Sequence, residues 1–295
     1  MSQLTVSSHC ASFDLLDALQ RWTTTGRRTA LATVTDINGS APVSLGPAFA
    51  VNDAGEVAGS IGGGCVEAAV IAEARTVLAT GESVARTYGC SDGLVDVASL
   101  CGGTLTMELA IITESVLVSL TANSAPPASL YLVGANAYAA ALVPIARQIG
   151  CDVLVVDPRP AFLSARHFSN ATTVLGWPED VVPTATLCRR DAVVVLAHDE
   201  RFEATFLPTV LSSEVGYVGA LGSRNAHARR LERLRAARVS ETQIARLAAP
   251  IGLDLGADNA AEVAVSIAAE MIAARHARSG GRLLLGSGPI HSVLG

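Results

Sequence analysis

Residues 130–157 decide the fold, and they read LYLVGANAYAAALVPIARQIGCDVLVVD. A short apolar run, Leu130–Val133, ends at Gly134 and is followed by an apolar helical pattern from Ala137 to Ile149. A second apolar run then leads to Asp157. Short apolar strands that alternate with helices predict a parallel sheet covered on both faces.

The same alternation continues toward the C-terminus. Further strands are expected at Thr172–Leu175, Val193–Leu196 and Tyr217–Leu221, and helices at about 200–212, 224–238 and 260–278. The adjacent Pro126 and Pro127 stop helices and remove strand donors, so the linker is placed around them. The sequence thus predicts an α/β protein with a small N-terminal α+β domain at 1–115, a linker at 116–128 and a Rossmann-like parallel-sheet domain at 129–295.

The N-terminal part shows a different mixture of patterns. A helix is expected at Phe13–Trp22, a strand at Ala30–Val34, a hairpin around Asn52–Gly55, a long helix at Val66–Ala79 and a strand at Thr104–Ile112.

Composition excludes several classes of function. Half of the 295 residues are apolar, and the formal net charge of −6 argues against broad nucleic-acid binding. Every basic side chain is arginine, so neither a lysine Schiff base nor a Walker-type lysine is available. No basic leader or membrane-length apolar run is seen, so a cytoplasmic location without a membrane is expected, with the six cysteines as thiols.

The turn after Val133 departs from the dinucleotide fingerprint G-x-G-x-x-G. Gly134 is present and Ala139 suits helix packing, but Asn136 replaces the glycine that lets pyrophosphate approach. Asp157 stands where a ribose ligand is expected, and its alternative role is to cap a loop. NAD(P) binding is therefore disfavoured, while a nicotinamide- or nucleotide-dependent oxidoreductase with a degenerate fingerprint stays the rival function.

Two glycine-rich turns in the N-terminal part contain cysteine. Gly62-Gly63-Gly64-Cys65 opens the long helix, so backbone N–H groups and the helix dipole predict an anion cradle where a thiolate is favoured. Cys101-Gly102-Gly103 is the second turn, and the pair indicates a shared anionic or sulfur-handling site. The alternative is a tight turn that needs glycine, with packed, inert cysteines.

Residues that follow the later strands fall at the carboxyl edge of the expected parallel sheet, where ligands bind. His198, Ser223 and Arg224 occupy such positions, although His198 could equally be structural. The arginines from 224 to 238 are expected to form a solvated helix face. Glu262, Ser266 and Glu270 recur at helical spacing and are expected to face solvent as one polar stripe.

Several motifs, in order from about Thr29 to Arg275, resemble the XdhC/CoxI family, whose members assist maturation of xanthine dehydrogenase and related molybdenum hydroxylases. The motifs are Gly39-Ser40-Ala41-Pro42 with Gly46, Gly59–Glu67, Cys101–Gly103, His198-Asp199, Tyr217–Arg224, Pro250–Asp254 and Glu262–Glu270. Three departures stand out: Val43 replaces an arginine usual in the family, Asn136-Ala137 replaces its Gly-His, and Asp157-Pro158-Arg159 keeps only the ends of an acidic-acidic-Arg run.

The resemblance implies an XdhC/CoxI domain followed by a Rossmann domain, and a protein that binds, protects and inserts molybdenum cofactor. The implied partner is an apo-molybdoenzyme of the xanthine dehydrogenase type; a cysteine desulfurase and a second copy of the chain are further candidates. On this resemblance a maturation chaperone is expected rather than an enzyme, with the oxidoreductase named above as the alternative. The candidate cofactor-binding residues are Gly62, Gly63, Gly64, Cys65, Glu67, Cys101, Gly102, Gly103, Gly134, Asp157, His198, Ser223 and Arg224. A third hypothesis is an adaptor that has lost its ligand.

Overall fold

The computed structural model describes residues 13–39, 43–62, 65–89, 95–96, 103–123, 127–163, 167–197 and 202–286. The chain divides into two units, Met1–Pro126 (unit 1) and Pro127–Gly295 (unit 2). Across the described ranges, every helix is too short or too polar to cross a membrane.

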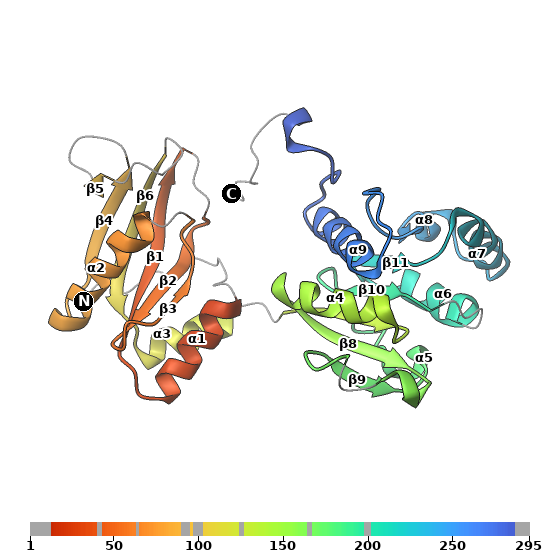
Figure 1. The fold of residues 1–295 in the computed structure, drawn as a ribbon, viewed down its shortest axis with the longest axis horizontal. Coiled ribbons are helices and arrows are strands. Elements are labelled where there is room, and N and C mark those ends of the chain that lie inside the picture. Colours follow the sequence, from red (N-terminus) through yellow and green to blue (C-terminus); the bar gives the residue numbers. More distant parts are fainter. Residues whose placement is uncertain are drawn as a thin grey trace. The chain divides into compact units, whose positions relative to one another are not determined.

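Unit 1 is built on a six-stranded sheet with the strand order β3-β2-β1-β6-β4-β5 (Figure 1). Its elements are α1 (Phe13–Thr24), β1 (Thr29–Asn38), β2 (Gly46–Asn52), β3 (Val57–Gly59), α2 (Cys65–Thr80), β4 (Val84–Gly89), β5 (Val95–Asp96), β6 (Thr104–Ile111) and α3 (Glu114–Asn123). Neighbouring strands pair antiparallel except β4 and β5, which pair parallel.

Both faces of this sheet are covered, as the alternation of side chains along β1 shows. Ala30 and Ala32 pack in the cluster that includes Val66 and Val70 of α2. Leu31 points to the opposite face, where it packs with residues of α1 and α3. The first six residues of β1 are buried, so this part of the strand fixes the register, because a slip by one residue would exchange its two faces.

Unit 2 holds a six-stranded, all-parallel sheet with the order β12-β11-β10-β7-β8-β9. The strands are β7 (Ala128–Val133), β8 (Cys151–Asp157), β9 (Thr172–Leu175), β10 (Ala192–Val195), β11 (Tyr217–Ala220) and β12 (Leu247–Ala248). The helices are α4 (Ala137–Gln148), α5 (Pro178–Val181), α6 (Leu207–Leu211), α7 (Arg224–Ala236), α8 (Glu241–Ile244) and α9 (Ala260–Arg275), with a π-helical turn at Phe202–Phe206 before α6. Numbered within the unit, the strands run 3-2-1-4-5-6, which is the Rossmann order.

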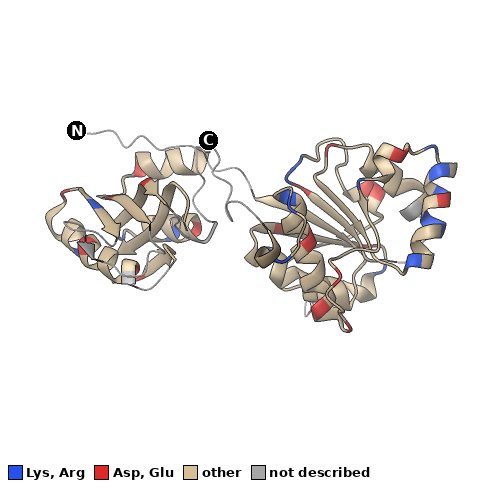
Figure 2. Cartoon of the chain, turned by 90° about the horizontal axis from the view of Figure 1, so that it is seen from above, with Lys and Arg blue, Asp and Glu red and all other residues tan. Residues whose placement is uncertain are grey.

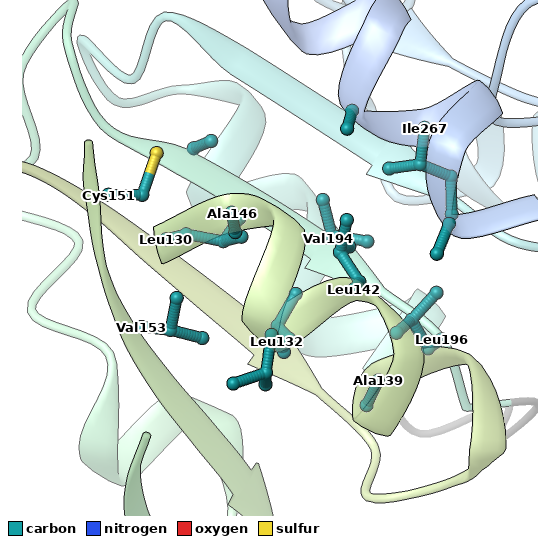
Figure 3. Close-up of a cluster of buried hydrophobic side chains, with 14 of the residues drawn as sticks. Leu130, Leu132, Ala139, Leu142, Ala146, Cys151, Val153, Val194, Leu196 and Ile267 are labelled. Carbon is teal, nitrogen blue, oxygen red and sulfur yellow. The ribbon is translucent and has the colours of Figure 1, made fainter. Parts of the chain in front are cut away.

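Helices cover the two faces of this sheet in separate groups. α4 and α9 enclose one core, in which Leu142 and Ile267 meet Val194 of the central strand (Figure 3). α6 and α7 cover the other, which contains Val193. The predicted fold class, a small α+β part followed by a Rossmann-like parallel sheet, is confirmed.

Several regions differ from the sequence expectations, and three of them bear on the linker, on the unit 1 sheet and on α7. The stretch assigned to the linker, 116–128, contains most of α3, because Leu117 and Leu120 pack into the unit 1 core. Strand β4 was not expected. Basic positions recur along α7 (Figure 2). Arg230 is nevertheless fully buried, whereas the other arginines of this helix keep more exposure, so the prediction of a solvated face is wrong for that residue.

Candidate functional site

Two of the glycine-rich segments of unit 1, the one that follows β1 and the one that precedes β6, adjoin the same edge of its sheet. The last residue of β1, Asn38, pairs with Thr104, the first residue of β6. On the other side of β6, Tyr88 of β4 pairs with Leu105. The chain that leaves β1, the chain that leaves β4 and the chain that enters β6 therefore share this edge, which we call the unit 1 edge.

The third segment reaches the same edge through β3. Because β3 pairs antiparallel with β2, and β2 with β1, β3 runs in the direction of β1 and ends toward the unit 1 edge. α2 then returns across the sheet to β4, which also runs in this direction. α2 must therefore begin at the unit 1 edge, with Cys65 as its first residue.

The turn between β3 and α2 is held from inside by Glu67. Its Oε1 accepts hydrogen bonds from the Ser60 hydroxyl at 2.9 Å and the Ile61 N–H at 3.0 Å. The Ile61 side chain is fully buried, and Gly62 has a φ of +87°, a value that favours glycine. The Ile61 N–H and the Ser60 hydroxyl lower the pKa of Glu67 because they favour the carboxylate. Glu67 thus shapes the turn.

Gly59 makes the tight approach of this turn to the sheet feasible. Its φ is +84°, and a Cβ added there would lie 2.1 Å from the carbonyl oxygen of Ala48. Since the Ser60 N–H donates to that same oxygen at 3.1 Å, a side chain at position 59 would disrupt the entry into the turn.

Several predicted site residues of unit 1 receive no structural account. Gly63, Gly64, Cys101 and Gly102 lie outside the described residues, and for Cys65 only the helical backbone is described. Gly103 is buried beside the end of β4, where its carbonyl oxygen would lie 3.1 Å from a Cβ on Gly89.

Val43, which stands where the family usually has arginine, is half-buried and packs with Leu45 against the unit 1 core. An apolar contact thus replaces a charge at this position of the edge.

The sequence reasoning overlooked Tyr88. Its side chain is fully buried at the end of β4, and its hydroxyl has no hydrogen-bond partner in the described part of the chain. Burial, and then the nearby Glu73 carboxylate, raise the pKa of Tyr88 to about 12 against the opposing effect of Arg86. The only sequence signal was a tyrosine immediately before Gly89-Cys90 in an alternating strand.

In unit 2, the turn that carries phosphates in dinucleotide-binding Rossmann folds is closed by the chain itself. The Ala135 N–H donates to Asp157 Oδ2 at 2.8 Å. Asn136 is the N-cap of α4: its Oδ1 accepts from the Ala139 N–H at 3.1 Å, and its Nδ2 donates to the Leu196 carbonyl at 3.0 Å. Gly134 has a φ of +108°, and a Cβ there would lie 2.8 Å from Ala197.

The hydrogen-bonding capacity of Asp157 is used up within this turn. Its Oδ1 accepts from the Arg159 backbone N–H and Nε, both at 2.9 Å, and its Oδ2 accepts from Ala135 and from an Arg159 terminal nitrogen at 2.8 Å. These four bonds fill the roughly four lone-pair sites of a carboxylate. Burial alone would raise the pKa of Asp157, but the hydrogen bonds from Arg159 and Ala135 outweigh it and lower the pKa.

Two other predicted unit 2 residues follow β11 at the carboxyl edge of the sheet. Ser223 caps α7 by accepting from the Ala226 N–H at 3.2 Å, and Arg224 is exposed at the start of that helix. His198 lies outside the described residues.

The expectation that Glu262, Ser266 and Glu270 of α9 face solvent is wrong for Ser266 and Glu270. Ser266 is buried and its hydroxyl donates to the Leu253 carbonyl at 2.5 Å. Glu270 Oε2 accepts from the Tyr217 hydroxyl at 2.5 Å and the Gly252 N–H at 2.9 Å. Ser266 and Glu270 therefore bind the loop before α9. The expectation failed because helical spacing groups residues on one face but does not reveal what covers that face. Glu262 remains exposed and accepts from the Asp258 N–H.

Within the parts of the chain that the structure describes, no three or more His, Cys, Asp and Glu side chains gather closely enough to hold a metal ion.

The fold defines a class: a protein with an α+β unit on a largely antiparallel sheet, followed by a Rossmann unit whose phosphate turn is closed by its own side chains. Two family descriptions match this chain, "XdhC Rossmann domain" over residues 130–271 and "XdhC and CoxI family" over residues 22–89. The chain belongs to the XdhC/CoxI family.

Three relatives match this chain over different shares of their own length. The Escherichia coli K12 protein YqeB is 30% identical over 263 residues, 88% of this chain and 46% of that protein. The E. coli K12 molybdenum cofactor insertion chaperone PaoD is 27% identical over 268 residues, 85% of this chain and 84% of PaoD. A probable xanthine dehydrogenase subunit of Bacillus subtilis 168 is 31% identical over 151 residues, 51% of this chain and 44% of that protein. The chain thus spans about half the length of the first and third.

A solved structure supports the architecture. A Bacillus halodurans protein described as a xanthine dehydrogenase superposes with a TM-score of 0.77 at 20% identity, covering 90% of this chain and 97% of that one. At this identity the likeness establishes the fold alone.

Proposed function

We propose that this chain binds molybdenum cofactor at the unit 1 edge and delivers it to an apo-molybdoenzyme of the xanthine dehydrogenase type. The observation that carries the proposal is the convergence of the glycine-rich segments on the start of α2. The similarity to PaoD, a molybdenum cofactor insertion chaperone, supports the class of ligand.

The start of α2 differs from the starts of α3, α4, α7 and α9. Thr113 precedes α3 and accepts from the Val116 N–H, and Asn136, Ser223 and Asn259 cap α4, α7 and α9. Residue 64, before α2, is a glycine and has no side chain to accept such a bond. Since Glu67 turns to Ser60 and Ile61, the first N–H groups of α2 remain suited to an anionic ligand.

The residue types fit this cofactor, which carries a phosphate and a sulfur-ligated metal. The glycine N–H groups and the positive end of α2 would hold the phosphate, and Cys65 or Cys101 would supply a soft thiolate. Glu67 would act by fixing the turn. The cofactor itself supplies the redox metal, so the chain's tasks are to bind it, exclude water and release it.

Cofactor binding is tested by mixing the anaerobically purified full chain with released molybdenum cofactor and measuring metal and pterin after a sizing column. Coelution near one per chain is expected, and Cys65→Ala or Cys101→Ala should lower it. Cys188→Ala is the matched control, because Cys188 is a half-buried free thiol of unit 2. A wild-type chain that emerges without metal and pterin would refute the proposal.

Delivery needs a separate test. The loaded chain, mixed with an apo-enzyme of the xanthine dehydrogenase type, should restore more activity than the same amount of free cofactor. Equal restoration by both would contradict an insertion role even if binding holds.

The rival function, a nicotinamide-dependent oxidoreductase, is disfavoured by the closed turn of unit 2. Both the Ala135 and Ala139 N–H groups, which lie where pyrophosphate normally binds, already donate to side chains of the chain. Titration with NADH and NADPH should show no saturable binding at micromolar concentration; saturation there would revive the rival.

A further inference from the structure

Unit 2 has a cavity at the amino edge of its sheet, opposite the edge where Rossmann ligands bind. The cavity has a volume of about 520 Å³. Its walls come from the loops before β10 and β11, from Arg246 just before β12, and from the last turns of α9. All of these segments are described and belong to unit 2.

The charged residues of this cavity are unbalanced. Four arginines line it, Arg189, Arg190, Arg246 and Arg275, against two acids, Asp191 and Glu214. Asp191 is committed to the backbone, since its two oxygens accept from the Ser129 and Cys188 N–H groups, both at 2.9 Å. Glu214 is highly exposed and lies 4.0 Å from Arg189. Such a loose exposed pair contributes little, so the cavity keeps a positive excess.

Arg246 is held rigidly without a carboxylate. Its guanidinium donates to the carbonyl oxygens of Leu211, Ser213 and Val215 at 2.6, 2.8 and 2.5 Å. These bonds use three of its five N–H groups and leave two. A guanidinium positioned in advance loses little conformational entropy when it binds an anion.

Arg275 approaches from α9. It donates to the Ile149 carbonyl and to Cys151 Sγ, both at 3.3 Å, so three of its N–H groups remain. Among the described residues, neither Arg246 nor Arg275 forms an ion pair with a carboxylate. Together the two guanidinium groups offer more donors than a single carboxylate can accept through one fork, which suits the several oxygens of a phosphate.

The remaining wall can accommodate an organic group. Met271, Ala274 and the ring of Tyr217 line the cavity, and the hydroxyl of Tyr217 is already bound to Glu270. A volume of 520 Å³ falls in the range of small-molecule sites, about 300–1,000 Å³, and exceeds what an inorganic phosphate needs.

We propose that this cavity is a binding site for a phosphate-bearing small molecule, held through Arg246 and Arg275. It is distinct from the carboxyl edge of the same sheet, and it does not depend on cofactor binding by unit 1. The Rossmann unit, with its usual phosphate turn closed, then still has a phosphate site at its other edge.

The test is calorimetric titration of the full chain with inorganic pyrophosphate, with citrate as a carboxylate probe. Pyrophosphate should bind saturably and weaken as salt rises, because the contacts are ionic. Arg275→Gln should raise the Kd about tenfold or more, the effect of losing charge-assisted hydrogen bonds. Arg229→Gln is the matched control: Arg229 is exposed on α7, outside the cavity, and its loss changes the net charge equally.

Arg275→Lys is a second variant that separates a loss of binding from a loss of folding, because it keeps the charge and loses only the planar fork. It should retain part of the affinity, with a thermal unfolding midpoint close to that of the wild type. Three results would overturn the proposal: no pyrophosphate binding at millimolar concentration, an equal loss in Arg229→Gln, or citrate binding as tight as pyrophosphate.

Discussion

The helix that begins at the unit 1 edge, α2, and the helix that begins at the carboxyl edge of the unit 2 sheet, α4, differ in how their first turns are capped. In unit 2, Asn136 caps α4 and Asp157 holds the Ala135 N–H, so the turn is complete without a ligand. In unit 1, glycine precedes α2, and the nearby Glu67 binds back to its own turn. The comparison indicates that an asparagine at a helix start supplies a hydrogen bond that a glycine there leaves to another partner.

The largest effect is expected where the chain fills its own site. Asp157→Ala removes a buried carboxylate and leaves the Ala135 N–H and the Arg159 guanidinium without it, so the free energy of unfolding should fall by about 2–3 kcal/mol. Urea denaturation measures this. A fall of less than about 0.5 kcal/mol would mean that Asp157 does not close the turn.

Asn136→Ala should cost less, about 1–2 kcal/mol, because it removes one N-cap and one bond to the Leu196 carbonyl. The matched control is Ser223→Ala, which removes only the cap of α7. If both variants lose the same stability, the hydrogen bond from Asn136 to Leu196, just after β10, contributes nothing.

Glu67→Gln sharpens the comparison through pH. The pKa of Glu67 is lowered on folding, so its contribution to stability is present above the unfolded value, about 4.3, and is lost as pH falls through the lower folded value. The variant should be less stable than the wild type by under about 1 kcal/mol at neutral pH, and the difference should shrink in acid. Urea unfolding across pH checks this; a difference that grows below pH ~4 would contradict the assignment.

The smallest effect concerns Tyr88. Its buried hydroxyl has no partner within the described ranges, so Tyr88→Phe should change the free energy of unfolding by less than about 0.5 kcal/mol or raise it. Thermal unfolding decides this, and a loss of more than about 1 kcal/mol would show that the hydroxyl is satisfied in solution.

The sequence allowed the fold to be predicted wherever local periodicity and burial agree. The alternation that begins at Leu130 is of this kind, and so is the helix expected at Val66–Ala79, found as α2. β4 was missed because Arg86 and Thr87 interrupt its apolar pattern. α3 was missed because the expected linker, placed around Pro126 and Pro127, was extended back to residue 116 and so included most of this helix.

Residues at the ends of strands could be predicted from the sequence, but their contacts could not. Asp157 was placed correctly at the end of its strand, but only the structure shows that Arg159 and Ala135 occupy it. Ser266 and Glu270 were assigned to solvent because a sequence does not reveal which loop folds over a helix face. The arginines of the amino-edge cavity come from segments far apart in the chain, so no local motif could indicate them.

The most direct test of the central claim is the molybdenum and pterin retained by variants of the full chain after anaerobic gel filtration. Gly64→Asn would give α2 the kind of cap that Asn136 gives α4, and this variant and Cys65→Ala should lose most of the cofactor. Asn136→Ala, if it stays folded, should retain the wild-type amount. Retention by Gly64→Asn and Cys65→Ala with loss in Asn136→Ala would place the cofactor in unit 2 and contradict the account.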